Sequence, residues 1–170
     1  NIVDEAFAHV ASCVTNERRL SEYDLQQFIL SRIRDAGMTT SSAPIAAVDA
    51  HSADPHYGPT ESSSSLITRD NLVLIDLWAK QTAPGSVYGD ITWTGYTGTE
   101  APAKQRIIFE HVRRGRDAAL SFVQDQVATG RFPCGWEVDD VCRTTIRTAG
   151  YGDFFIHRTG HSIGEEVHGN

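Results

Sequence analysis

The sequence predicts a mixed α/β fold in which pairs of helices accompany an antiparallel β-hairpin. A continuous apolar run at residues 72–75 is typical of a strand that is buried on both faces. β-Branched and aromatic residues enrich a second strand at 86–94. Residues 83–85, Ala-Pro-Gly, have the chemistry of a tight turn between the two strands.

Helices are expected on both sides of this hairpin, because apolar residues recur there at helical spacing. Ser21 is a suitable N-cap for the second helix, with Asp24 three residues later. Gly37 and Gly150 are suitable stops for the second and fourth helices. The expected helices are residues 2–14, 21–36, 103–128 and 136–149, and the third has Val112 on its inner face.

Two further strands are expected outside the hairpin, at residues 44–48 and 154–156. Residues 51–65 have the composition of a surface loop. The loop is long for a segment without structure of its own, and such loops are often functional.

The two helix pairs resemble each other. A shift of 113 residues places Ile33 on Ile146 and Gly37 on Gly150 without a gap. This match indicates an internal duplication inside a single domain. The halves are predicted at about 1–100 and 103–170. The second half would need its own hairpin near residues 185–205, so we expect the chain to be truncated.

Composition limits the possible partners. The chain has 170 residues, 40% hydrophobic and 22% charged, as in an ordinary globular domain. Its net charge of −7 argues against nucleic acid or an anionic membrane as the main partner. Cys13, Cys134 and Cys142 share no C-x-x-C spacing, which predicts free thiols and a cytoplasmic location.

Each hairpin strand carries one carboxylate, Asp76 and Asp90. Two acids that face each other beside an apolar segment repel and resist burial, unless a cation lies between them. Three of the seven histidines gather at the end of the chain, at His157, His161 and His168. Imidazole with carboxylates is a ligand set for a transition metal, which makes a metal site the first functional hypothesis.

The segments IDLWAK, YGDITWT and HRTGHSIGEEVHG, in this order, resemble the metal-dependent aminopeptidase and prolidase family with the pita-bread fold. Within that family the chain is most similar to the Xaa-Pro aminopeptidase and Xaa-Pro dipeptidase branch, from Ala6 onward. The resemblance implies an α/β (α+β) fold. A curved antiparallel sheet would be flanked by two helix pairs with pseudo-twofold symmetry, and the second half would be incomplete here.

The resemblance also implies a metal centre. Asp76 would bind one metal ion, Asp90 would bridge two ions, and His161 would bind the second. Two glutamates beyond Asn170 would complete the site. The cofactors implied are two divalent ions, manganese first, with cobalt, zinc or iron as the other choices. Two such ions lower the pKa of a water molecule enough to supply hydroxide near neutral pH.

Three histidines are implied to contact the substrate. His56 would line the substrate pocket, while His157 and His168 would stabilise the tetrahedral intermediate. The implied activity is hydrolysis of the bond between an N-terminal residue and proline, so the partner is a peptide with proline in second position. A homodimer is also implied, and the 170-residue chain alone is expected to be inactive.

Two other functions stay open at this point. One is a pita-bread domain that binds a partner without catalysis, and the other is a metal-free, creatinase-like hydrolase. A plain globular domain whose acids and histidines are all structural is the third possibility. The joint presence of Asp76, Asp90 and His161 counts against these alternatives. The two aspartates stand 14 residues apart, a longer gap than the family usually has, and a longer turn at residues 81–86 would accommodate the extra residues.

Overall fold

The structure is a computed structural model, and it describes residues 1–169. These residues form two compact units. Unit 1 comprises Asn1–Ala101 together with the C-terminal segment from Ser162, and unit 2 comprises Pro102–His161. The predicted halves, 1–100 and 103–170, remain a prediction about duplication. They differ from the compact units because the C-terminal segment packs with unit 1.

Unit 1 begins with α1 (Ile2–Thr15) and α2 (Glu22–Asp35), which confirms both predicted helices. The cap of α2 is reciprocal: the Ser21 side chain accepts from the Asp24 amide, and the Asp24 carboxylate accepts from the Ser21 amide. Gly37 follows the helix with a φ of +68°, in the left-handed region where glycine is unstrained. The predicted start and stop of α2 are therefore confirmed.

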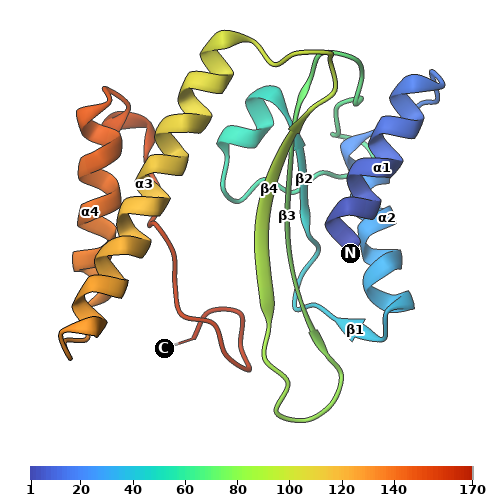
Figure 1. Cartoon of the computed structure of the whole chain (residues 1–170). Helices are drawn as coiled ribbons and strands as arrows, with labels where there is room; N and C mark the ends of the chain where they lie inside the picture. The colour runs from blue at the N-terminus through green and yellow to red at the C-terminus, as the bar shows by residue number, and fades with distance from the viewer. Residues whose placement is uncertain (170) are drawn as a thin grey trace. The chain divides into compact units, whose positions relative to one another are not determined.

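A four-stranded antiparallel sheet follows, in which β3 pairs with each of the other strands. The strands are β1 (Met38–Thr39), β2 (Ile45–Val48), β3 (Leu72–Gln81) and β4 (Gly89–Tyr96). Within unit 1, α1 and α2 lie together against one face of this sheet (Figure 1). The predicted strand at 44–48 is confirmed. β1 has two residues, too few to show a period in the sequence.

The first hairpin strand differs from its prediction in length and burial. It extends to Gln81, and its residues alternate between buried and half-buried positions. Val73 and Ile75 are fully buried, whereas Leu72 and Leu74 are only half-buried. The expectation of burial on both faces is therefore wrong, because α1 and α2 cover one face only. β4 begins three residues later than predicted and ends two residues later.

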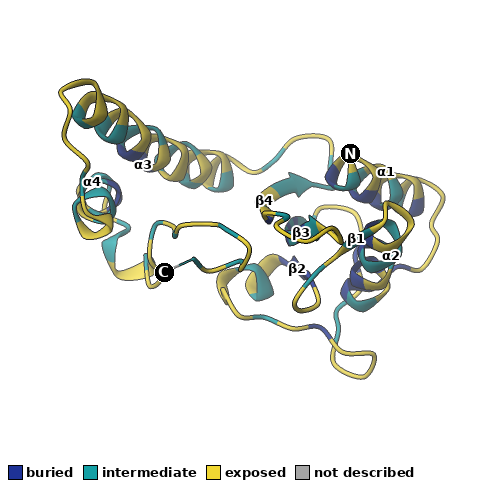
Figure 2. Cartoon of the chain, turned by 90° about the horizontal axis from the view of Figure 1, so that it is seen from below, coloured by how far each residue is buried: buried dark blue, intermediate teal, exposed yellow. Residues whose placement is uncertain are grey.

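The main core lies between α1, α2 and the covered face of β3 (Figure 2). Its members are apolar and at most 7% exposed, so removal of their surface from water is the main stabilising term of unit 1. The residues that α1, α2 and β3 contribute are Val3, Ala6, Val10, Cys13, Leu25, Ile29, Ile33, Val73, Ile75, Leu77 and Ala79.

Unit 2 consists of α3 (Ala103–Ala128) and α4 (Gly135–Thr148), which confirms the two predicted helices to within one residue. The helices approach closely at Gly115, where a Cβ would lie 3.0 Å from Cys142 Sγ and 3.1 Å from Ile146 Cγ1. Ala119, Cys142 and Ile146 form a small core. Residues 102–161 contain no β-strand.

Two expectations about unit 2 are wrong. Residues 154–156 form no strand: a short 3-10 helix spans Gly152–Phe154 instead. Phe154 and Ile156 are 78% and 73% exposed. Unit 2 contains no strand with which this apolar run could pair, so the apolar pattern alone led to a wrong prediction of a strand. Val112 is 53% exposed, although it stands at helical spacing from Gly115 and Ala119, the two buried residues of α3.

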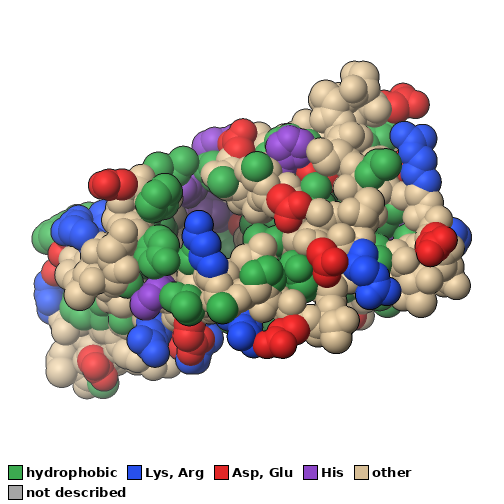
Figure 3. Space-filling model, turned by 90° about the horizontal axis from the view of Figure 1, so that it is seen from above, with side chains coloured by type: hydrophobic (Ala, Val, Ile, Leu, Met, Phe, Trp, Pro, Cys, Tyr) green, Lys and Arg blue, Asp and Glu red, His purple; other side chains and the backbone are tan. Residues whose placement is uncertain are grey.

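Both apolar and charged side chains are exposed on the face that Figure 3 shows. Among residues 1–169, no helix has the length and apolar character needed to cross a membrane. Large apolar side chains that stay exposed on α3 are Ile107, Phe109, Val112, Leu120 and Val127.

Candidate active site

Asp76 and Asp90 lie on the same face of the β3–β4 hairpin. Asp76 pairs with Thr92 across the two strands, and Asp90 pairs with Trp78. Paired residues share a face, and these two pairs are two residues apart, so the carboxylates are diagonal neighbours. The expectation that the acids face each other directly is wrong, because the pairing register offsets them by two residues.

Asp76 occupies the central strand and is half-buried. Its other cross-strand neighbour is the apolar Ile45 of β2. The Thr92 hydroxyl donates a 2.6 Å hydrogen bond to Asp76 Oδ1, which orients the carboxylate on the sheet. A strand lined by apolar residues would disfavour a second nearby negative charge, so a cation would stabilise this pair of acids.

The C-terminal segment is fastened to the same hairpin. Lys80 lies on the face of Asp76, and its Nζ donates a 2.6 Å hydrogen bond to the Glu165 carbonyl. The backbone N–H of Tyr88 donates to the Gly164 carbonyl at 2.9 Å. Ser162 and Gly169 then close the segment on itself with two hydrogen bonds of 2.8 and 2.9 Å. His168 therefore belongs to a closed turn beside the hairpin of unit 1.

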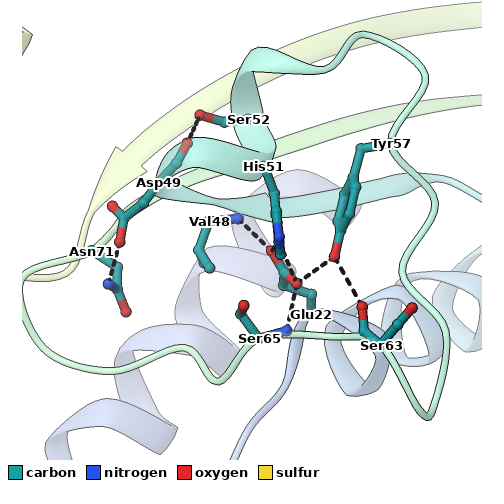
Figure 4. A network of polar contacts seen from close by, with 9 residues as sticks. All are labelled: Glu22, Val48, Asp49, His51, Ser52, Tyr57, Ser63, Ser65 and Asn71. Carbon is teal, nitrogen blue, oxygen red and sulfur yellow. Dashed lines mark hydrogen bonds and ion pairs between the residues drawn. The ribbon is translucent and has the colours of Figure 1, made fainter.

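His56 lies in the loop that follows a 3-10 helix at Asp49–Ala53. Its backbone N–H donates to Asp54 Oδ1 at 2.9 Å. The next residue, Tyr57, donates its hydroxyl proton to Glu22 Oε2 at 2.7 Å (Figure 4). Burial and this carboxylate raise the pKa of Tyr57 to about 12.

Glu22, His51 and Tyr57 were not predicted from the sequence. In the sequence, Glu22 looks like an ordinary acidic residue in the first turn of a helix. Nothing near it in the sequence indicates that its side chain is fully buried. Its partners come from residues 48–65, far along the chain, so no local spacing could have indicated them.

His157 and His161 belong to unit 2. Arg143 of α4 donates to the carbonyl oxygens of Phe155 and His157, at 2.7 and 3.1 Å. Asp139, one turn earlier, accepts from Arg143 and from the amide and hydroxyl of Thr159. The Arg143 hydrogen bonds, with those from Thr159, lower the pKa of Asp139 to about 2. This pair of side chains fixes the backbone that carries His157.

The predicted ligands are thus divided between the units: Asp76 and Asp90 in unit 1, and His161 at the end of unit 2. Within residues 1–169, the structure forms no group of three or more His, Cys, Asp or Glu side chains that could hold a metal ion. Two diagonal carboxylates remain in unit 1. Carboxylate oxygens and imidazole nitrogens suit divalent manganese, iron, cobalt and zinc, so these residues fit as part of such a site.

Comparison with known proteins identifies the family. The model of metallopeptidase family M24 matches residues 1–170. The chain belongs to metallopeptidase family M24. An Xaa-Pro dipeptidase of Lactobacillus helveticus is 34% identical over 137 residues, which are 81% of this chain and 34% of that protein. An Xaa-Pro dipeptidase of Lactobacillus delbrueckii subsp. lactis is 30% identical over 168 residues, 95% of this chain and 39% of that protein.

A solved structure places this M24 chain in the expected fold class. The crystal structure of a prolidase from Thermococcus sibiricus superposes with a TM-score of 0.74 at 28% identity, over 99% of this chain and 42% of that one. The pita-bread fold and the Xaa-Pro peptidase branch predicted from the sequence are both confirmed. The chain spans about a third to two fifths of the length of the two dipeptidases.

Proposed function

We propose that the whole protein is a metal-dependent exopeptidase that hydrolyses the bond between an N-terminal residue and a following proline. It would act as an Xaa-Pro aminopeptidase or an Xaa-Pro dipeptidase. The observation that carries this proposal is the pair Asp76 and Asp90, on one face of one hairpin, in a chain of a metallopeptidase family. The two Xaa-Pro dipeptidases that match the chain support the substrate class.

In this proposal Asp76, Asp90 and His161 hold two divalent ions. Bound there, the ions would act as Lewis acids and supply hydroxide near neutral pH. Thr92 keeps Asp76 oriented through its 2.6 Å hydrogen bond. Manganese is the proposed metal, although cobalt, zinc and iron accept the same donors.

The proposed contacts with the peptide come from His56, His157 and His168. An imidazole N–H can donate to the oxygen on which negative charge develops when the peptide carbonyl is attacked. Each of these histidines lies in a segment held by hydrogen bonds to a helix or a strand. Such fixation favours catalysis, because a donor that is already oriented needs no reorganisation during the reaction.

A cytoplasmic location and a homodimer complete the proposal. All three cysteines are free, and Cys13 and Cys142 are buried, which supports a reducing compartment. The net charge of −7 supports a soluble peptide as the partner instead of nucleic acid or an anionic membrane.

The test is hydrolysis by the whole protein of an Xaa-Pro dipeptide and of a longer peptide with proline in second position. The same peptides with alanine in place of proline serve as controls. We expect proline-dependent turnover that a chelator abolishes and manganese restores. Asp90→Ala should abolish it, whereas Asp125→Ala, an exposed carboxylate on α3, should leave it unchanged.

Three results would contradict parts of this proposal. Turnover that persists in the presence of chelator would favour a metal-free, creatinase-like hydrolase. Binding of the peptides without cleavage, under every metal condition, would favour a non-catalytic binding domain. Equal cleavage of the proline and alanine peptides would refute the substrate class while keeping the reaction.

A further inference from the structure

Glu22 is the first residue of α2, and its side chain has no exposed surface. A buried carboxylate is costly unless hydrogen bonds replace its water. The backbone N–H groups of Val48 and Ser65 each donate to it at 2.7 Å, to Oε1 and Oε2 respectively. The helix N-terminus, with its exposed amide dipoles, also favours a negative charge at this position.

Two side chains complete the shell around Glu22, as Figure 4 shows. The Tyr57 hydroxyl donates to Oε2 at 2.7 Å, and His51 Nδ1 lies 2.9 Å from Oε1. In the tautomer that carries its proton on Nδ1, His51 donates to this carboxylate. The two rings stack with their centroids 4.4 Å apart. One carboxylate therefore gathers four groups from residues 48–65.

Two members of this network flank His56 in the sequence. His51 precedes it by five residues, and Tyr57 follows it directly. Between them, the Asp54 amide donates to the His51 carbonyl, and the Tyr57 amide donates to the Asp54 carbonyl, at 3.2 and 3.1 Å. The His56 amide is itself bound to Asp54 Oδ1. The conformational freedom of backbone residues 51–57 is therefore restricted as long as Glu22 binds the side chains at both ends of this segment.

We propose that Glu22 is a positioning residue for His56: through His51 and Tyr57 it fixes the loop so that the imidazole of His56 is presented to the peptide. The inference rests on the proposed peptidase function, because it assumes that His56 contacts substrate. Glu22 itself does not touch the peptide. A loop of this length would otherwise sample many conformations, and each would misplace the imidazole.

Tyr57→Phe is the sharpest variant, because it removes only the hydroxyl that reaches Glu22 and keeps the ring that stacks on His51. The matched control is Tyr96→Phe, which removes a hydroxyl that donates to the carboxylate of Asp70 elsewhere in unit 1. In the whole protein, amide hydrogen exchange of residues 54–57 should accelerate in Tyr57→Phe and stay unchanged in Tyr96→Phe. Unchanged exchange in Tyr57→Phe would overturn the inference.

Kinetics then separate positioning from general stability. We expect kcat/KM for an Xaa-Pro peptide to fall roughly tenfold to a hundredfold in Tyr57→Phe, mainly through kcat. If Tyr57 acts through His56, the same substitution should have no further effect in a His56→Ala background. An equal loss in both backgrounds would show that Tyr57 acts independently of His56, which would overturn the inference.

Glu22→Gln should loosen the loop further, because its amide N–H2 would face groups that are themselves donors. If that variant fails to fold, Tyr57→Phe still decides. Failure of the two proposals can be told apart. A wild-type protein without turnover refutes the peptidase function, whereas an active Tyr57→Phe protein with wild-type kinetics refutes only the positioning role.

Discussion

The two helix pairs end at equivalent positions in the sequence but differ in how many residues they bury. α1 ends at Thr15 and α3 at Ala128, 113 residues later, and α2 and α4 are related by the same shift at both ends. The first pair buries nine residues, whereas the second buries Gly115, Ala119, Cys142 and Ile146. Local sequence therefore determines where these helices begin and end, while burial depends on the sheet available to pack against.

The local signals are similar in the two pairs. The Asp24 carboxylate accepts from the N-cap amide of Ser21, and the Glu137 carboxylate accepts from that of Cys134. Gly37 and Gly150, at the end of each pair, have φ angles of +68° and +87°. A duplication into halves 1–100 and 103–170, which stays a prediction from the sequence, would produce such matches.

A second similarity is that each helix pair donates a side-chain hydrogen bond to a backbone carbonyl in the segment that follows it. Gln26 of α2 donates to the Pro44 carbonyl at 2.8 Å, in a buried position. Arg143 of α4 donates to the carbonyl of His157, which is 113 residues after Pro44. The hydrogen bond from Gln26 involves only neutral groups, whereas the donor Arg143 also forms an ion pair with Asp139. The two contacts should therefore respond differently to pH.

The largest contrast is expected for a core substitution at related positions. Leu25→Ala removes a side chain with no exposed surface and should lower the free energy of unfolding of unit 1 by about 2–5 kcal/mol. Val138→Ala, its counterpart in half-buried surroundings, should cost unit 2 about 1 kcal/mol or less. Urea unfolding of each variant measures both values, and equal losses would contradict the difference in burial.

The glycine stops should respond alike. A side chain at a positive φ is strained, and a Cβ at Gly37 or Gly150 would meet no atom within 4 Å. Gly37→Ala and Gly150→Ala should each cost about 1–2 kcal/mol, from backbone strain alone. A thermal melt of each variant tests this, and a clear effect in only one would argue against equivalent helix ends.

The N-caps should differ by a smaller amount. Ser21→Ala removes a hydroxyl that accepts from the Asp24 amide and should cost about 1 kcal/mol. Cys134→Ala should change the stability of unit 2 by less than about 0.5 kcal/mol, because a thiol is a weak acceptor. Comparable losses, measured by urea unfolding, would mean that the sulfur caps α4 as effectively as the hydroxyl caps α2.

Of these two contacts, only the ion pair of Arg143 with Asp139 in unit 2 should respond to pH. The folded pKa of Asp139, about 2, lies below its ordinary value of 3.8, so its contribution to stability is present above about pH 4. It is lost as the pH falls toward 2. Melting temperatures of wild type and Asp139→Asn should therefore converge across this window. Curves that stay parallel from pH 5 to pH 2 would refute the role of Asp139.

Local patterns predicted the helix ends, the hairpin turn and the strand at 44–48, because each depends on residues close together in the sequence. The features that escaped prediction depend on distant residues. The offset of Asp76 from Asp90 depends on the register of β3 against β4, and the burial of Glu22 depends on donors 26 to 43 residues away. Residues 154–156 have an apolar strand pattern but no strand beside them in unit 2.

The most direct test of the metal site is a count of the ions that the whole protein binds, by equilibrium dialysis against manganese and elemental analysis. Wild type and Asp125→Ala should bind two ions per chain, Asp76→Ala and His161→Ala fewer, and Asp90→Ala none with high affinity. Wild-type protein without bound metal, or Asp90→Ala with a full complement, would contradict the assignment of Asp90 as the ligand shared by both ions.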